Sequence, residues 1–249
     1  MFDFINIINM IKISETPLKV AESVAEEFRN ICEEYISKTG NINIAISGGN
    51  TPKLLFEVLA KDYKDKIDWS KINFYWADER CVSPDSNESN FGMTFNFLFN
   101  KINIPESNIH RIYGENDPAS EAVRYSEELR KNIFLSNGFP KFDLILLGMG
   151  DDGHTASIFP DQMELLNSVD VCAVAVHPES RQKRITLTGN VINNAVKIYF
   201  MVTGKNKAEV ISEILGQKNN YLKYPAAHIQ SNYNYPFWFL DKEAASLLN

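Results

Sequence analysis

Apolar and polar positions along the N-terminal part of the chain predict a helix, a strand and a second helix. Over residues 15–38 apolar side chains recur every three or four positions, which is typical of an amphipathic helix. The β-branched run at 41–46 predicts a strand, and the second helix is predicted over 52–60. We expect Thr51 to cap that helix through its hydroxyl, because Pro52 suits the first helical position.

The same alternation continues over the rest of the chain. Strands are predicted at residues 71–76, 142–147, 171–176, 184–187 and 197–202, and helices at 118–135 and 205–215, with a Phe-rich helix that ends near 99. Residues 142–147 are almost all apolar, as expected of a strand covered on both faces. Alternating strands and helices predict an α/β fold with a mostly parallel sheet, helices on both faces, and functional side chains at the strands' carboxyl ends.

Composition and charge restrict the class of protein. The chain has 249 residues and no repeat, low-complexity tract or linker, so we expect a single domain over residues 1–249. Its net charge is −7, and no Lys/Arg-rich run occurs. Nucleic acids and anionic membranes attract basic surfaces, so we predict neither as a partner. We expect a monomer that binds a small molecule.

The remaining bulk features indicate a cytoplasmic protein without a metal site. The N-terminus lacks the basic lead and the cleavage site of a signal peptide, and no apolar run is long enough for a membrane span. Cys32, Cys81 and Cys172 form no Cys-x-x-Cys motif, which fits a reducing compartment. The four histidines lack the spacing of metal ligands.

One glycine loop joins a predicted strand to a helix, through Ser47, Gly48, Gly49, Asn50 and Thr51. Backbone N–H groups and the helix dipole would favour a phosphate there, and the glycines would let it approach closely. A plain strand–helix connection explains the loop equally well. The sequence around Ser47 also resembles a degenerate nucleophile elbow, but an elbow needs its helix directly after the serine, and Pro52 marks the helix start five residues on.

A second glycine loop follows the apolar strand. Residues 148–153 match the G-x-G-x-x-G pattern of dinucleotide-binding proteins. However, Asp151 and Asp152 would place carboxylates against a pyrophosphate, and Pro160 leaves little room for the helix that this motif requires. We therefore reject NAD and expect no cofactor.

The same loop contains a candidate base. His154 follows Asp152 by two residues, at the end of a predicted strand. An isolated histidine is more often structural, but a glycine-rich loop at a strand end favours a functional role. The sequence alone does not establish that the Asp152 carboxylate reaches the imidazole.

Charged residues follow other strands. The simplest interpretation of Asp-Glu-Arg at 78–80 is a surface salt-bridge cluster, and residues 181–184 hold the densest basic cluster. Lys205 and Lys207 begin a predicted helix, where cations oppose the dipole. This placement indicates a bound anion, although lysines that are merely solvated would explain it as well.

Taken together, these loops resemble those of the 6-phosphogluconolactonase family. The matching stretches are residues 47–52, 76–82 with 89–90, 143–160, 184–188, 204–205 with 207, 225–227, and 237–241 with 244–245. The match runs from about residue 40 to the C-terminus, and the Asp-Gly-His-Thr-Ala-Ser block at 152–157 is its most specific part. Asn50 stands where the family commonly has Ser, and Ala77 where Gly is frequent.

The resemblance implies a Rossmann-like fold shared with sugar-phosphate isomerases and deaminases. It also implies hydrolysis of 6-phospho-D-glucono-1,5-lactone to 6-phosphogluconate in the oxidative pentose phosphate pathway. His154 would be the general base, oriented by Asp152, and Arg80 would stabilise negative charge on the carbonyl oxygen. Asp78 would bind sugar hydroxyls or anchor Arg80. The phosphate would be held by the loop that begins at Ser47, through Gly48, Gly49, Asn50 and Thr51, and by Arg184 and Lys205.

Two other functions compete with this one. An amino-sugar-phosphate deaminase of the same fold typically continues Asp-Gly-His with Asn-Glu-Pro, whereas here Thr155 and Ala156 follow His154. Arg80 also stands where that family has Tyr. A non-catalytic sugar-phosphate sensor could keep the phosphate site and lose the base. The presence of both His154 and Arg80 argues against it.

Overall fold

The central sheet consists of seven parallel strands in the computed structural model, which describes residues 10–248. Across the sheet the order is β1 (Ile11–Ser14), β12 (Phe237–Asp241), β11 (Lys197–Val202), β8 (Leu144–Leu147), β2 (Ile42–Ile46), β3 (Ile72–Trp76) and β5 (Ile109–His110). All four residues of β8 are buried, as the apolar run predicts. The predicted α/β fold with a mostly parallel sheet is confirmed.

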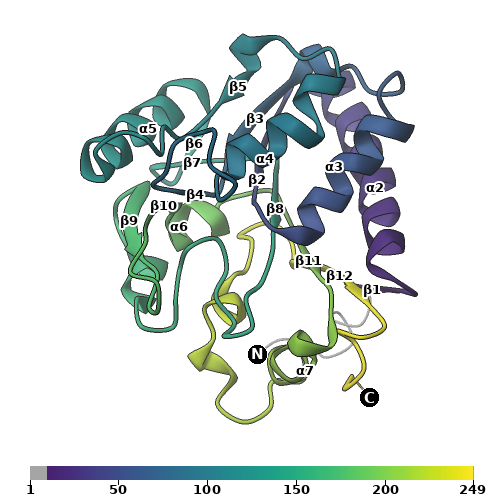
Figure 1. The fold of residues 1–249 in the computed structure, drawn as a ribbon, viewed down its shortest axis with the longest axis vertical. Coiled ribbons are helices and arrows are strands. Elements are labelled where there is room, and N and C mark those ends of the chain that lie inside the picture. The colour runs from purple at the N-terminus through teal and green to yellow at the C-terminus, as the bar shows by residue number, and fades with distance from the viewer. Residues whose placement is uncertain (1–9, 249) are drawn as a thin grey trace.

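Helices cover both sides of the central sheet. On one side lie α2 (Pro17–Thr39), α3 (Asn50–Asp62) and α4 (Asn90–Phe97), and α5 (Pro118–Asn132) lies on the other (Figure 1). The chain also forms α6 (Gly189–Asn193), α7 (Ala208–Gly216) and 3₁₀ turns at Trp69–Lys71, Phe99–Lys101, Glu106–Asn108, Met163–Asn167, Lys205–Lys207, Tyr221–Lys223 and Pro225–His228. None of the helices in the described part is long and apolar enough to cross a bilayer.

A small antiparallel sheet contains strands that sequence reasoning assigned to the main sheet. It has the order β4 (Asp78–Arg80), β10 (Lys183–Leu187) and β9 (Cys172–Val176). The predicted strands at 171–176 and 184–187 therefore exist, but they pair with each other and with β4. Pairing depends on distant partners, which local β-propensity does not specify. Short strands β6 (Leu135–Ser136) and β7 (Phe139–Pro140) form a hairpin beside α5.

Local capping explains where α2 starts, whereas the start of α3 corrects a prediction. The Thr16 hydroxyl accepts a hydrogen bond from Lys19 N at 3.3 Å and so caps α2. Helix α3 begins at Asn50 with Gly49 at the N-cap, so the prediction of Thr51 as N-cap is wrong. Gly49 has φ 113°, a conformation that glycine adopts readily, and it turns the chain into the helix earlier than expected. The Thr51 hydroxyl instead lies 2.8 Å from that of Thr203.

The strand order places a crevice between β2 and β8. From β2 the chain continues to its neighbour β3, whereas from β8 it continues to β11 on the opposite side. Loops that leave adjacent parallel strands in opposite directions open a crevice at the carboxyl ends of those strands. Both glycine loops identified in the sequence lie there, which agrees with the predicted location of the site.

Candidate active site

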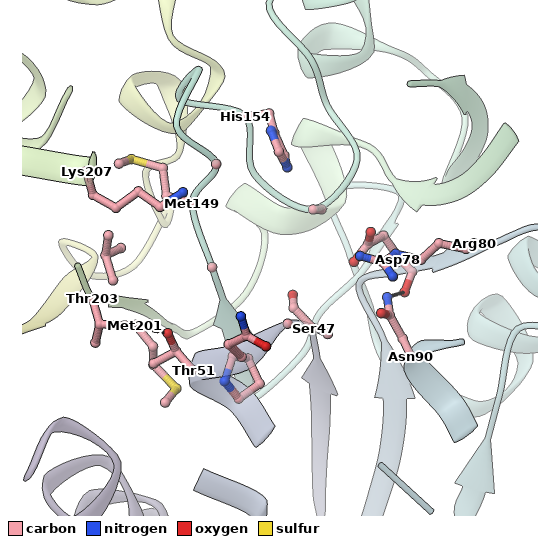
Figure 2. Close-up of a pocket in the computed structure, with 18 of the residues that line it drawn as sticks. Ser47, Thr51, Asp78, Arg80, Asn90, Met149, His154, Met201, Thr203 and Lys207 are labelled. Carbon is pink, nitrogen blue, oxygen red and sulfur yellow. Dashed lines mark hydrogen bonds between the residues drawn. The ribbon is translucent and has the colours of Figure 1, made fainter. Parts of the chain in front are cut away.

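An open pocket of about 320 Å³ lies at this crevice. Its lining includes residues of the loop after β2, of β4 and β10, and of the loops after β8 and β11, namely Ser47, Gly48, Gly49, Asn50, Thr51, Pro52, Asp78, Arg80, Asn90, Gly148, Met149, Gly150, His154, Ala156, Arg184, Met201, Val202, Thr203 and Lys207. Figure 2 shows Asp78, Arg80 and Asn90 on one side, Lys207 and Thr203 on the opposite side, and His154 and Ser47 between them. The structure thus brings most of the predicted site residues to one cavity.

The loop after β2 gives one wall of this pocket a positive potential. The N-terminus of α3 opens on the pocket at Gly49 and Asn50. A Cβ at Gly48 would lie 1.8 Å from Asn90 Oδ1, so only glycine allows this close packing. The hydroxyl of Ser47 is buried and has no hydrogen-bond partner among the described residues. Free backbone donors and an unpaired hydroxyl are suited to an anion.

His154 is held by Asp152, as the sequence suggested without establishing it. Asp152 Oδ1 lies 2.6 Å from His154 Nδ1 and also accepts the backbone N–H of His154 at 3.1 Å. Burial opposes ionisation of the Asp152 carboxyl, but its hydrogen bonds and charge interaction with His154 outweigh burial and lower its pKa. An ionised carboxylate can only accept, so in a neutral imidazole Nδ1 carries the proton and Nε2 has the free lone pair. This is the tautomer that a general base needs.

Close packing fixes the imidazole in place. The ring of His154 contacts that of Phe159, with centroids 4.8 Å apart. A Cβ at Gly150 would lie 2.1 Å from His154 Nδ1, so the ring sits directly against the backbone of the second glycine loop. Gly153 has φ 76° and packs against Tyr224, where a side chain would clash. The glycines at 150 and 153 therefore allow the imidazole of His154 and the ring of Tyr224 to pack directly against this loop.

The contact at Gly150 gives a first prediction. We expect Gly150→Ala to displace the imidazole from Asp152 and to lower turnover of the natural substrate markedly, with binding of inorganic phosphate retained. Gly148→Ala controls for added bulk in the same pocket loop, because a Cβ there meets no protein atom within 4 Å and leaves the imidazole in place. Steady-state kinetics of both variants check the expectation. Equal effects of the two methyl groups would contradict it.

Asp78 and Glu79 do not form the surface salt-bridge cluster that their sequence first suggests. They are only 4% and 3% exposed. Glu79 accepts hydrogen bonds from the backbone N–H groups of Asn90 and Phe91, both at 2.8 Å, and so fixes the start of α4. Asp78 faces the pocket and accepts a hydrogen bond from Ser157 at 2.7 Å. No ion pair joins Asp78 to Arg80 among the described residues, so Asp78 does not anchor that arginine.

Two arginines lie side by side in the pocket without a carboxylate partner. Arg80 and Arg184 are register partners on β4 and β10. Arg80 Nη1 donates to the carbonyl of Glu88 at 2.7 Å, but the Nε atoms of both arginines are buried and lack partners within the described chain. Burial, and then the charge of Arg80, lower the pKa of Arg184. Two neighbouring arginines that form no ion pair with a described carboxylate are suited to an anionic ligand.

Lys207, rather than Lys205, lines the pocket. The position of both lysines in the sequence indicated a bound anion, but the resemblance assigned phosphate binding to Lys205 alone. In the structure Lys205 is exposed and does not line the pocket, whereas Lys207 lines it and forms an ion pair with Asp151. The two lysines lie two residues apart in a 3₁₀ turn, so their side chains point in different directions. Asn90, Thr203 and Met201 also line the pocket, and of these only Asn90 was part of the matched motifs.

The described residues contain no group of three or more His, Cys, Asp or Glu side chains that could hold a metal ion. The pocket presents one carboxylate-bound imidazole, two arginines, one lysine, a buried carboxylate and a helix N-terminus. This set can bind an anionic group, activate a water molecule and stabilise a developing oxyanion.

Comparisons with known proteins agree with the resemblance in the sequence. Residues 15–238 match a family described as glucosamine-6-phosphate isomerases/6-phosphogluconolactonase. The chain is 43% identical over 234 residues to a 6-phosphogluconolactonase of Aggregatibacter actinomycetemcomitans, covering 94% of this chain and 97% of the relative. The solved 6-phosphogluconolactonase of Trypanosoma brucei is 27% identical, with a TM-score of 0.85 over 96% of this chain and 98% of that one. A monomeric glucosamine-6-phosphate deaminase shares the fold, with a TM-score of 0.79 at 20% identity, over 95% of this chain and 99% of that one.

Proposed function

Because the chain belongs to the glucosamine-6-phosphate isomerase/6-phosphogluconolactonase family, we propose that it hydrolyses 6-phospho-D-glucono-1,5-lactone to 6-phosphogluconate. The observation that carries this proposal is the convergence of His154, held by Asp152, and Arg80 on one pocket. If the two side chains lay on opposite sides of the molecule, the proposal would have no chemical basis. The pocket lining within the described residues includes no glutamate, which argues against the deaminase alternative.

His154 would act as the general base. Its Nε2 takes a proton from a water molecule whose oxygen attacks the lactone carbonyl carbon. The ring C–O bond then breaks, and the imidazolium returns the proton to the departing ring oxygen, which becomes a hydroxyl group. Asp152 holds the required tautomer and stabilises the positive charge that forms on the ring. General-base assistance of this kind contributes a factor of about 10²–10⁴ to the rate.

Arg80 would stabilise the negative charge that develops on the carbonyl oxygen in the tetrahedral intermediate. Its guanidinium group already has one partner, the carbonyl of Glu88, which fixes its position before substrate binds. A preorganised donor acts in this way without reorganising during the reaction. A lactone is an activated ester, so no covalent nucleophile is required. Consistent with this, His154 makes no hydrogen bond to Ser47, the only serine that lines the pocket within the described residues.

The substrate phosphate would lie against the N-terminus of α3. Gly48, Gly49, Asn50 and Thr51 line this wall, and the Ser47 hydroxyl has no other partner. Arg184 and Lys207 supply positive charge. Holding the phosphate in this way would fix the lactone carbonyl relative to the base.

The two lysines of the 3₁₀ turn provide a matched pair of variants. We expect Lys207→Ala to raise KM for the lactone by about 10- to 100-fold, the loss that follows removal of a charge-assisted contact to phosphate. Lys205→Ala should leave KM close to that of the wild type, because its side chain lies outside the pocket. Initial-rate kinetics check both. A larger effect at Lys205 would restore the assignment made from the sequence.

A pH-stat assay with freshly prepared lactone tests the proposed activity directly. Hydrolysis releases acid at a rate proportional to enzyme concentration, whereas a sugar-phosphate sensor binds the ligand and does not raise that rate. Ammonia release from glucosamine 6-phosphate would instead reveal a deaminase.

We also propose that the chain acts as a monomer in the cytoplasm. The three cysteines are free thiols, which fits a reducing compartment. Sedimentation velocity measures the oligomeric state.

A further inference from the structure

Ser157 connects the base-bearing loop to the strands that carry the arginines. It lies three residues after His154, is fully buried, and does not line the pocket. Its hydroxyl donates to Asp78 Oδ2 on β4 at 2.7 Å, and its backbone N–H donates to Thr186 Oγ1 on β10 at 3.2 Å. Thr186 and Asp78 are themselves register partners. One residue thus holds two neighbouring strands and the loop in a fixed arrangement.

A tight turn brings Ser157 into this position. Ile158 N donates to the carbonyl of Thr155 at 2.9 Å, and Ala156, between them, has φ 48°. A non-glycine residue in the left-handed region costs free energy, so the surrounding contacts must maintain it. The turn directs both donors of Ser157 to the small sheet, away from solvent.

Asp78, which receives the hydroxyl of Ser157, has one carboxylate oxygen left for a ligand. It is 4% exposed and faces the pocket, and no cation within the described chain forms an ion pair with it. Its Oδ2 is occupied by Ser157, whereas no described residue donates to Oδ1. A buried carboxylate needs hydrogen-bond donors, and it repels a phosphate. The hydroxyl groups of a sugar are donors of the required kind.

We propose that Ser157 is a positioning residue that holds Asp78 in place to accept hydrogen bonds from the hydroxyl groups of the substrate. This proposal rests on the proposed function. It adds to that function a residue outside the pocket that sets selectivity for polyhydroxylated ligands. Ser157 fixes the rotamer of Asp78 through Oδ2, so that Oδ1 faces the sugar. The phosphate then lies against the N-terminus of α3, and this carboxylate contacts the part of the ligand that carries the hydroxyl groups.

The test compares two ligands, 6-phosphogluconate and inorganic phosphate, by calorimetry. We expect Ser157→Ala to weaken binding of 6-phosphogluconate about tenfold, as when one hydrogen bond to a charged group is lost. Binding of inorganic phosphate should not change. In kinetics with the lactone, KM should rise with little change in kcat, because the lost contact serves substrate and transition state alike. Ser157→Cys, which nearly preserves the volume but donates weakly, should give the same pattern if Ser157→Ala folds poorly.

A double-mutant cycle separates this role from a general loosening of the loop. If Ser157 acts through Asp78, Ser157→Ala should have no further effect on 6-phosphogluconate binding in the Asp78→Ala background. Ser126→Ala is the control, because its hydroxyl also fixes the small sheet, through Cys172 N at 3.1 Å, far from the pocket. It should leave both affinities unchanged.

Two results would overturn the proposal: weakened binding of both ligands, or an equal loss on the Asp78→Ala background. Failure of the proposed function is a separate result, since it would appear as absent acid release by the wild-type protein. The calorimetric comparison does not depend on turnover.

Discussion

Replacing His154 by alanine is expected to lower kcat for lactone hydrolysis by about 10²–10⁴-fold, the contribution of a positioned general base. His154 is the only histidine in the described pocket lining, and its contact with Asp152 through Nδ1 leaves Nε2 available for a water proton. It makes no contact with the wall formed by the α3 N-terminus. The affinity for 6-phosphogluconate should therefore remain close to that of the wild type. A pH-stat assay measures kcat, and calorimetry measures the affinity for 6-phosphogluconate.

His177 provides the control for this variant. Its ring also packs against Phe159, with centroids 5.2 Å apart, but it does not line the pocket. His177→Ala removes a comparable aromatic contact and should keep most of the turnover. Near-normal turnover of His154→Ala, or an equal loss in both variants, would end the assignment of His154 as the base.

Arg80→Ala should give the second-largest loss, a decrease of about 10²–10³-fold in kcat, which is typical when an oxyanion donor is removed. An interaction made mainly in the transition state lowers kcat and kcat/KM together and leaves KM nearly unchanged. Arg184 lies next to Arg80 on the neighbouring strand, so the same substitution there is a stringent comparison. We expect Arg184→Ala to act mainly on KM, because its proposed ligand is the phosphate.

Arg80→Lys refines this prediction. Lysine retains the positive charge but cannot donate to the Glu88 carbonyl and to a ligand through one planar group. Partial recovery of kcat is expected from charge alone. If Arg80→Ala instead raised KM and spared kcat, Arg80 would belong to the phosphate site, and the oxyanion would need another donor.

The candidate site was largely predictable because its residues lie in local motifs. The apolar run before residue 148 and the β-branched run before Ser47 identify two strands, and parallel strands bring their carboxyl ends to the same edge. The strand at 71–76 brings Asp78 and Arg80 to this edge as well, and in the structure they line one pocket with Ser47 and His154. The contact between Asp152 and His154 needed coordinates, since a separation of two residues in a loop does not define where two side chains point.

The sequence by itself determined four strands of the central sheet, β2, β3, β8 and β11, and with them the fold class, whereas it did not predict β1, β5 or β12. Those properties depend on periodicity, glycine positions and burial preference, which act over a few residues. Only the tertiary structure decided that β4 pairs with β10, that Lys207 rather than Lys205 lines the pocket, and that Ser157 reaches Asp78. Each of these depends on contacts between residues far apart in the chain or on the direction of one side chain. Long-range packing determines such contacts, and no local pattern encodes them.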